Sequence, residues 1–338
     1  MEMSNRQLGK AVALVGPTAS GKSAVVLHLA NMLGGEIISV DSMQVYRRLD
    51  IGTAKPTLIE RARVRHHLID ILDLHETFDV HQFSRLAEST VAEIQCRGRM
   101  PLFCGGTGLY LKAWCEGLGT APASDPAMRK DLEARALPDL VAELATLDPE
   151  ASPIIDLSNR RRVIRAIEIV RLTGQRLLSQ RAPWKKGSWA PVGSEESHPK
   201  VIMLGLCRSR EDLWRRIDAR TEAMIKNGLV EETRRLLDAG LRENRSVSLA
   251  LGYRQVLDHL QRKTLLKDTL EQIKAATRRY ARRQMTWFRH QLPVRWVDLP
   301  PAESPEETAR RIACLLVQEG AACDKTPDAK RLSRIETS

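Results

Sequence analysis

The sequence predicts an α/β fold, in which a parallel sheet flanked by helices is interrupted by a helical insertion. Apolar, strand-like runs alternate with helical periodicity over residues 1–115, and the alternation returns after residue 200. Between about residue 121 and residue 199, helical periodicity continues without a convincing strand. We therefore expect a core of residues 1–119 and 200–319, a helical insertion domain of residues 120–199 and a disordered tail of residues 320–338.

The expected core elements follow from short apolar runs, which indicate strands, and from the helical patterns between them. Alternation at this spacing is typical of a parallel sheet with helices on both faces. In chain order we expect a strand at 11–15, a helix at 22–33, a strand at 36–42, an irregular stretch, a helix at about 80–97, a strand at 101–106, a helix from near Thr107, a strand at 201–207, helices from 209 to about 290 and a strand at 294–299.

The composition indicates a globular protein without membrane segments. Of the 338 residues, 43% are hydrophobic and 28% are charged, which allows a full hydrophobic core. No apolar run approaches the roughly 20 residues of a membrane span, and residues 1–10 lack the apolar segment of a signal peptide, so we expect a cytoplasmic location. The six cysteines include no C-x-x-C pair, which argues against a disulfide framework and against a zinc site.

The formal net charge of +11 predicts an anionic partner larger than a nucleotide, with nucleic acid as the first candidate. The positive charge is concentrated in two segments, 158–187, where Glu168 is the one acid, and 273–291, which has none. These segments are either solvated helix faces or a clamp for a phosphate backbone, whose binding would depend strongly on salt. Three aromatic residues of the second segment, Tyr280, Trp287 and Phe288, either stack on bases or pack in the core. The basic residues of the first segment are Arg160, Arg161, Arg162, Arg165, Arg171, Arg176, Arg181, Lys185 and Lys186, and those of the second are Lys274, Arg278, Arg279, Arg282, Arg283 and Arg289.

A phosphate-binding loop is indicated by GPTASGKS, residues 16–23, which fits G-x-x-x-x-G-K-[ST]. In such a loop several backbone N–H groups converge on phosphate oxygens at the N-terminus of the following helix. Lys22 would reach the terminal phosphate, and the Ser23 hydroxyl would bind Mg²⁺. A glycine-rich turn before a helix is the weaker alternative, because a strand pattern precedes the motif and a helical pattern follows it. The motif predicts a P-loop NTPase-like core, but it leaves open whose phosphates are bound.

Six motifs in fixed order extend this pattern: GPTASGKS, DSMQVYRRLDIGTAKP (41–56), HHLID (66–70), GGTGLYLKA (105–113), LGYRQ (251–255) and RRQMTWFR (282–289). Together they closely resemble the tRNA dimethylallyltransferase (tRNA isopentenyl transferase) family, and the match runs from about Val12 to Arg289. The chain has no C-terminal Cys/His zinc finger, which fits the bacterial type. The family transfers a dimethylallyl group from dimethylallyl diphosphate to the exocyclic amine of the adenosine just 3′ of the anticodon, position 37.

The resemblance implies that the loop holds the diphosphate of a prenyl donor rather than ATP, with Mg²⁺ as cofactor. It also implies an arginine from the helix LWRRIDART, for which Arg220 is the first choice and Arg216, one turn earlier, the second. Neutralising charge on the leaving group is the physical purpose of all these groups. The expected diphosphate-binding residues are Gly16, Pro17, Thr18, Ala19, Ser20, Gly21, Lys22, Ser23, Arg220 and Arg216.

Asp41 is the candidate general base, because it ends a strand at the carboxyl edge of the sheet, where α/β proteins place ligands. An unperturbed aspartate is a weak base, so it would have to act through geometry and a dry pocket. The alternative is that Asp41 only holds Mg²⁺ through water. Thr107 is either an ordinary N-cap or, as the resemblance implies, a catalytic group against the adenosine and Asp41.

The resemblance further implies a tRNA anticodon stem-loop as partner of a monomeric enzyme, with the target base extruded into a pocket. Asp41, Ser42, Met43, Gln44 and Thr107 would line that pocket, and Gln44 is suited to hydrogen-bond bases. Further RNA contacts are expected at Arg129, at Arg161, Arg162, Val163, Ile164 and Arg165, and at Leu249, Ala250, Leu251, Gly252, Tyr253 and Arg254.

One departure from the family pattern affects these RNA contacts. The family usually shows Pro-Asn-Asp before the basic helix, whereas this chain reads DLSNRRRVIRAIE, so the contacts around residues 159–161 are open. His66 and His67 are expected to be structural, because adjacent histidines point apart and no third metal ligand is evident. Two other functions remain to be distinguished, a small-molecule kinase that uses the loop for ATP and a nucleotide-gated RNA-binding protein without prenyl chemistry.

Overall fold

The computed structural model describes residues 11–180 and 201–323. These residues divide into two compact units. We call residues 11–115 and 201–323 the core unit and residues 116–180 the helical unit. No helix in the described part of the chain is both long enough and apolar enough to span a bilayer.

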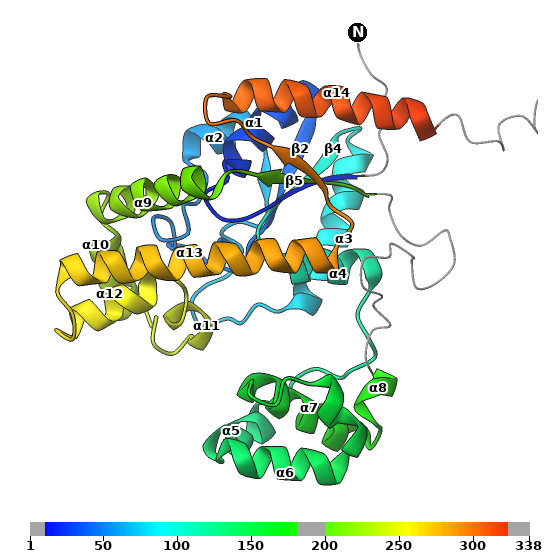
Figure 1. The fold of residues 1–338 in the computed structure, drawn as a ribbon, viewed down its shortest axis with the longest axis vertical. Coiled ribbons are helices and arrows are strands. Elements are labelled where there is room, and N and C mark those ends of the chain that lie inside the picture. Colours follow the sequence, from blue (N-terminus) through cyan, green and yellow to red (C-terminus); the bar gives the residue numbers. More distant parts are fainter. Residues whose placement is uncertain (1–10, 181–200, 324–338) are drawn as a thin grey trace, which may run out of the picture. The chain divides into compact units, whose positions relative to one another are not determined.

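A six-stranded sheet in the order β3-β2-β4-β1-β5-β6 forms the centre of the core unit (Figure 1). Every pairing in it is parallel, which confirms the predicted α/β class. The short strand β3 was not expected, because its two residues lie in the stretch predicted to be irregular. The strands are β1 (Ala11–Val15), β2 (Gly35–Val40), β3 (His66–His67), β4 (Met100–Gly105), β5 (Val201–Cys207) and β6 (Arg295–Asp298).

Helices cover both faces of this sheet, as Figure 1 shows. On one face Val25 and Leu29 of α1 pack with Ile312 of α14 over the strands. On the other face Phe83 of α3 and Phe288 of α13 pack there. The helices of the core unit are α1 (Lys22–Leu33), α2 (Leu58–Arg63), α3 (Val80–Cys96), α4 (Gly108–Glu116), α9 (Arg210–Lys226), α10 (Leu229–Asp238), α11 (Arg245–Ser248), α12 (Tyr253–Leu260), α13 (Leu266–Gln291) and α14 (Pro305–Cys323).

The C-terminal helix α14 corrects the sequence-based expectation of a disordered tail from residue 320. The helix continues to Cys323, and its buried side chains Ala309, Ile312 and Leu316 pack in the apolar core on this face of the sheet. Residues 324–338 lie outside the described residues.

The helical unit contains helices around a small apolar core and no strand among its described residues, 116–180. Leu140 and Leu144 of α6 pack against Val163 and Ile167 of α7. Asn159 caps α7 through a bond from the N–H of Arg162 at 3.4 Å. The elements are α5 (Pro126–Ala134), α6 (Leu137–Leu147), the 3₁₀ helix η1 (Pro149–Ile154), α7 (Arg160–Thr173) and α8 (Leu177–Gln180), while Arg181, Lys185 and Lys186 lie outside the described residues.

Candidate active site

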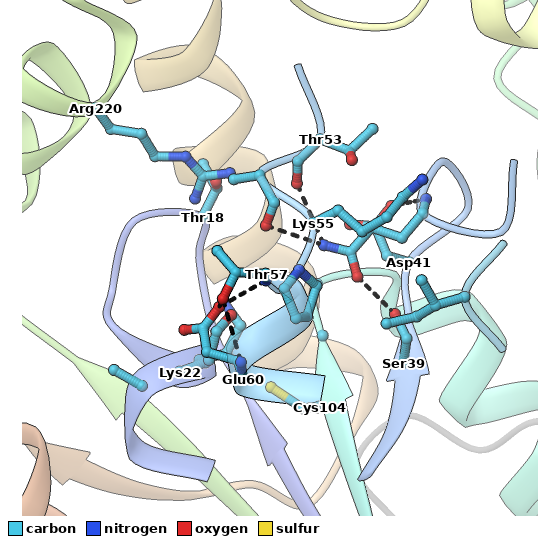
Figure 2. A pocket seen from close by; sticks show the side chains of 18 of the residues that line it. Thr18, Lys22, Ser39, Asp41, Thr53, Lys55, Thr57, Glu60, Cys104 and Arg220 are labelled. Carbon is cyan, nitrogen blue, oxygen red and sulfur yellow. Dashed lines mark hydrogen bonds between the residues drawn. The ribbon is translucent and has the colours of Figure 1, made fainter. Parts of the chain in front are cut away.

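A cavity of about 1050 Å³ opens in the core unit at the carboxyl ends of β1, β2 and β4. Its walls come from the loop between β1 and α1, from Asp41, Gln44 and most of residues 50–61 after β2, from the turn after β4, and from helices α9 and α13. Figure 2 shows Lys22, Asp41 and Arg220 around this cavity. The structure therefore brings the phosphate-loop motif, the candidate base and the preferred arginine into one site.

The phosphate loop, residues 16–23, has the backbone that its glycines permit. Gly16 has a φ of +139°, and a Cβ there would lie 2.8 Å from the carbonyl oxygen of Leu206. Gly21, with a φ of +97°, precedes the first turn of α1. The buried Lys22 donates from Nζ to the carbonyl oxygen of Pro17 at 2.7 Å. Burial lowers the pKa of Lys22 to about 8, with the Arg220 cation acting in the same direction and Asp41 against it.

The two candidate arginines of α9 have different surroundings. Arg216 donates from Nε to the carbonyl oxygen of Ala19 at 3.0 Å, so it braces the phosphate loop. Arg208 braces the same loop through the carbonyl of Ser20 at 2.8 Å. Arg220 lines the cavity and hydrogen-bonds to no group in the described part of the chain; burial lowers its pKa, and the charge of Asp41 opposes that shift. The N–H groups of the Arg220 guanidinium are therefore available to bind a ligand in the cavity.

Asp41 directly follows β2, and its carboxylate is fixed by the start of the next turn. Its Oδ1 accepts hydrogen bonds from the N–H of Met43 at 2.8 Å and from that of Gln44 at 3.2 Å. No described group donates to the other oxygen, Oδ2. The side chain is thus oriented by one oxygen and can accept a proton or a hydrogen bond at the other.

Thr107 lies in the turn between β4 and α4, next to Gly106 of the cavity wall. Its N–H donates to the carbonyl oxygen of Val40 at 3.1 Å, which ties this turn to the residue before Asp41. Its hydroxyl has no hydrogen bond within residues 11–180 and 201–323. The structure thus shows no N-cap bond from this hydroxyl, which leaves it available to a substrate.

Gln44 lines the cavity, but its amide is already used inside the protein. Its Oε1 accepts from the hydroxyl of Ser39 at 2.9 Å, and its Nε2 donates to the carbonyl oxygen of Thr53 at 3.2 Å. In this structure Gln44 therefore holds the segment after β2 in place. Ser42 and Met43 are partly exposed beside it.

Lys55 organises the same segment and was not singled out from the sequence. It is buried, and its Nζ donates to the carbonyl oxygen of Tyr46 at 2.9 Å, to Asp50 at 2.7 Å and to Asp70 at 2.6 Å. Asp70 also binds Arg61 at 2.7 Å. The position of Lys55 inside the family motif DIGTAKP could have marked it as important, but a sequence does not show that a lysine is buried.

Glu232 on α10 holds residues 50–52 in place, and two of them, Asp50 and Ile51, line the cavity. Its Oε2 accepts from the N–H groups of Asp50 at 3.1 Å and Ile51 at 2.7 Å, and its Oε1 accepts from that of Gly52 at 3.0 Å. The hydroxyl of Tyr253 donates to Oε1 at 2.7 Å. A Cβ at Gly52 would lie 2.5 Å from the Tyr253 ring.

The Tyr253 contact limits how this residue could meet RNA. Tyr253 is fully buried, so its side chain is not available to RNA, because it completes the Glu232 cluster instead. Gly252 is buried too, whereas Leu249 and Arg254 are exposed and Ala250 and Leu251 are partly exposed.

In the helical unit the predicted RNA residues fall into three groups. Arg161 and Arg162 are exposed. Arg129 and Arg165 each donate to Oε2 of the buried Glu168 at 2.7 Å. The side chains of Val163 and Ile164 belong to the apolar core, which leaves their backbone atoms for the predicted RNA contact.

Acids outside the two basic segments pair with many of the basic residues. In the helical unit Arg171 pairs with Glu143 and Arg176 with Glu150, while Arg160 donates to backbone carbonyls. On α13 Lys274 pairs with Glu222 and Glu271, and Arg278 pairs with Asp218. The low acid content of these segments therefore does not mean that their arginines and lysines are unpaired.

The aromatic and histidine residues divide similarly. Phe288 is fully buried and Trp287 packs edge-on against it, whereas Tyr280 lines the cavity. His67 pairs with Glu36 at 2.7 Å, and His66 bonds to the carbonyl of Val64 at 2.8 Å. Within the described ranges no three His, Cys, Asp or Glu side chains cluster as metal ligands.

Comparison with known proteins gives one consistent result. A family model described as IPP transferase matches residues 44–291. The tRNA dimethylallyltransferase of Thermomicrobium roseum is 42% identical over 313 residues, which cover 91% of this chain and 92% of that protein. That of Bacillus velezensis is 40% identical over 306 residues, covering 89% and 94%.

A solved structure agrees with these relatives. The full-length tRNA isopentenylpyrophosphate transferase from Bacillus halodurans superposes with a TM-score of 0.67 at 38% identity, over 94% of this chain and 100% of that chain. The resemblance seen in the six motifs is thereby confirmed over most of the chain. With the family model and these relatives in agreement, the chain belongs to the IPP transferase family.

Proposed function

We propose that this chain transfers a dimethylallyl group from dimethylallyl diphosphate to the exocyclic amine of the adenosine at position 37 of tRNA, releasing diphosphate. The observation that carries the proposal is the single cavity in which the phosphate loop and Arg220 meet Asp41. One part of that cavity suits an anionic leaving group, and another suits an amine that must lose a proton. The names of the relatives, tRNA dimethylallyltransferases, support the same reaction.

The leaving diphosphate is held by the phosphate loop. Backbone N–H groups at the start of α1, the Lys22 ammonium and the Arg220 guanidinium would offset the charge that develops as the carbon–oxygen bond breaks. Lys22 would exchange its bond to the Pro17 carbonyl for a phosphate oxygen. Arg216 keeps the loop in shape through Ala19, so we assign diphosphate contact to Arg220.

The residues present also fit Mg²⁺. The exposed Ser23 hydroxyl lines the cavity at the start of α1, and no cluster of three acidic or histidine ligands competes for the ion in the described ranges. This donor set suits a metal that keeps several waters and takes its other ligands from the substrate's phosphates. When bound, Mg²⁺ would neutralise part of the diphosphate charge.

The acceptor amine would meet Asp41 and Thr107. The adenine amine is a poor nucleophile because its lone pair is delocalised into the ring, so it must lose a proton as it attacks. Oδ2 of Asp41 is the oxygen left to take that proton, since Oδ1 is held by two N–H groups. The free hydroxyl of Thr107 would orient the same base.

We further propose that the part of tRNA recognised is the anticodon stem-loop and that a monomer acts on it in the cytoplasm. The exposed Arg161, Arg162 and Arg254 support contact with its phosphates, and the partly exposed Ser42 and Met43 beside Asp41 support a pocket for the extruded base.

Replacement of Asp41 by Ala distinguishes this transferase from a nucleotide-gated RNA-binding protein. We expect prenyl transfer to fall by about three orders of magnitude while tRNA affinity changes by less than about threefold. The measurement is single-turnover transfer beside tRNA binding, with wild type in parallel. Equal losses of binding and turnover would contradict the assignment of Asp41 as the base.

A further inference from the structure

Gln284 on α13 joins two loops of the cavity that are far apart in the sequence. The side chain is 7% exposed, and its Oε1 accepts from the N–H of Thr18 at 2.8 Å. Its Nε2 donates to the carbonyl oxygen of Gly106 at 3.0 Å. Thr18 belongs to the phosphate loop, and Gly106 immediately precedes Thr107. One amide group thus ties the loop for the leaving group to the turn for the acceptor.

The chemistry of this position suits an amide group. The N–H of Thr18 can only donate and the carbonyl of Gly106 can only accept, so the bridging group must accept at one end and donate at the other. The approach at Gly106 is so close that a Cβ there would lie 2.2 Å from Nε2 of Gln284. The glutamine and the glycine therefore form a matched pair.

We infer that Gln284 is a positioning residue for the transfer step, which fixes the spacing between the diphosphate loop and the Thr107 turn. This inference rests on the proposed function. Transfer requires the allylic carbon, held through its diphosphate, to meet the amine held at Asp41 and Thr107. A shift of about 1 Å between two such loops costs rate far more than it costs binding of either substrate.

Two variants test the inference by steady-state kinetics with both substrates varied. Gln284→Met keeps the length of the side chain but breaks both hydrogen bonds, so we expect kcat to fall about 10- to 100-fold while each KM stays within about threefold. Gln272→Met is the matched control, because Gln272 is an exposed glutamine on the same helix, and we expect wild-type kinetics from it. A wild-type kcat for Gln284→Met overturns the inference.

Gln284→Glu supplies a readout that general loss of packing would not produce. The carboxylate can still accept from Thr18, but it repels the carbonyl of Gly106; once protonated, it can donate there as the amide does. Burial favours the protonated form, so the ratio of variant to wild-type kcat should rise as the pH falls. Taking the ratio cancels the effect of pH on the rest of the site. The other ionisable groups that line the cavity are Lys22 of α1, Asp41, Asp50, Lys55, Glu60 and Arg61 of the segment after β2, His66 and Asp70 at β3, Cys104 of β4, Arg216 and Arg220 of α9, and Tyr280 of α13.

The opposite side of the contact gives a second, independent test. Gly106→Ala should lower kcat in the wild-type background, because its methyl group displaces the amide, and should cost little more in a Gln284→Ala background. Two results would overturn the inference: losses in kcat from Gly106→Ala and Gln284→Ala that simply add in the double variant, or a ratio of Gln284→Glu to wild-type kcat that does not change with pH. Neither result would contradict the proposed function as long as the wild-type enzyme transfers the prenyl group. If the wild-type enzyme transfers no prenyl group, the proposed function fails and this inference fails with it.

Discussion

Glu232 of the core unit and Glu168 of the helical unit are both buried carboxylates, 4% and 0% exposed, yet they bind very different partners. Glu232 accepts from three backbone N–H groups and from the Tyr253 hydroxyl. Glu168 accepts from Arg129, Arg165, the Ser124 hydroxyl and the N–H of Asp125. The first carboxylate fixes the shape of a cavity wall, and the second fixes the direction of two cations.

The electrostatic consequences differ as well. Although burial acts to raise it, the bonds from Ser124 and Arg165 and the charge of Arg129 hold the pKa of Glu168 below its usual value. Two guanidiniums against one carboxylate leave a local excess of positive charge, which suits a phosphate backbone. Among residues 11–180 and 201–323 no cation pairs with Glu232, so its cluster serves geometry rather than binding of an anion.

Glu232→Gln should produce the largest loss of stability. A glutamine has one oxygen where the cluster needs two, so a buried N–H and the Tyr253 hydroxyl would face an NH₂ group instead. We expect the free energy of unfolding to fall by about 3 kcal/mol, and kcat to fall because Asp50 and Ile51 line the cavity. Urea denaturation followed by circular dichroism measures the first effect.

Glu231→Gln is the control for that change, since Glu231 is the preceding residue and is exposed in a surface pair with Arg234 at 3.5 Å. It should alter the free energy of unfolding by less than about 0.5 kcal/mol. Similar losses in the free energy of unfolding of Glu232→Gln and Glu231→Gln would contradict the stabilising role assigned to the buried Glu232 cluster.

Glu168→Gln should have a smaller effect on stability and a distinct effect on RNA. The variant keeps an oxygen for Ser124 and Asp125 but presents an NH₂ group to both arginines, which releases them. We expect a loss of about 2 kcal/mol in the free energy of unfolding and about tenfold weaker tRNA binding. The KM for the prenyl donor should not change.

Binding of tRNA measured against salt concentration checks this prediction, because each lost phosphate contact lowers the slope of log affinity by about 0.7 to 0.9. Glu150→Gln is the control, since in the described part of the chain Glu150 forms one exposed pair, with Arg176. An unchanged affinity and slope in Glu168→Gln would assign Arg129 and Arg165 to structure alone.

Lys22 extends the comparison to a buried cation whose ammonium group contacts no carboxylate among the described residues. Its pKa is lowered to about 8 by burial, so it is charged below that pH and neutral above it. We expect kcat/KM for the donor to fall up to about tenfold per pH unit above pH 8. The decline in kcat should come at higher pH, because bound diphosphate favours the charged lysine. Initial rates between about pH 6.5 and about pH 9.5 test this, and a flat kcat/KM would contradict it.

Much of the site could be predicted because its signals are local. The spacing of Gly16, Gly21 and Lys22 after an apolar strand predicts a phosphate loop. The position of Asp41 at the end of a strand predicts that it lies at the carboxyl edge of the sheet. Alternation of strands and helices sufficed for the sheet, but not for β3, whose two residues carry no periodicity.

The groups that support the site could not be predicted, because their partners are distant in the sequence. Gln284 meets Thr18 across 266 positions and Glu232 meets Asp50 across 182, and neither glutamine nor glutamate carries a pattern that marks such a partner. The same limit explains the paired arginines. Arg278 has no acid near it in sequence, yet α9 brings Asp218 to it.

The most direct test of the account is which phosphates the loop holds. Purified protein, Mg²⁺ and isotopically labelled dimethylallyl diphosphate are incubated with unmodified tRNA, and ATP hydrolysis is followed in a parallel tube. We expect label on the adenosine beside the anticodon and no consumption of ATP. Absence of label together with tRNA-stimulated ATP turnover would contradict the account, because the loop would then be an ordinary nucleotide site.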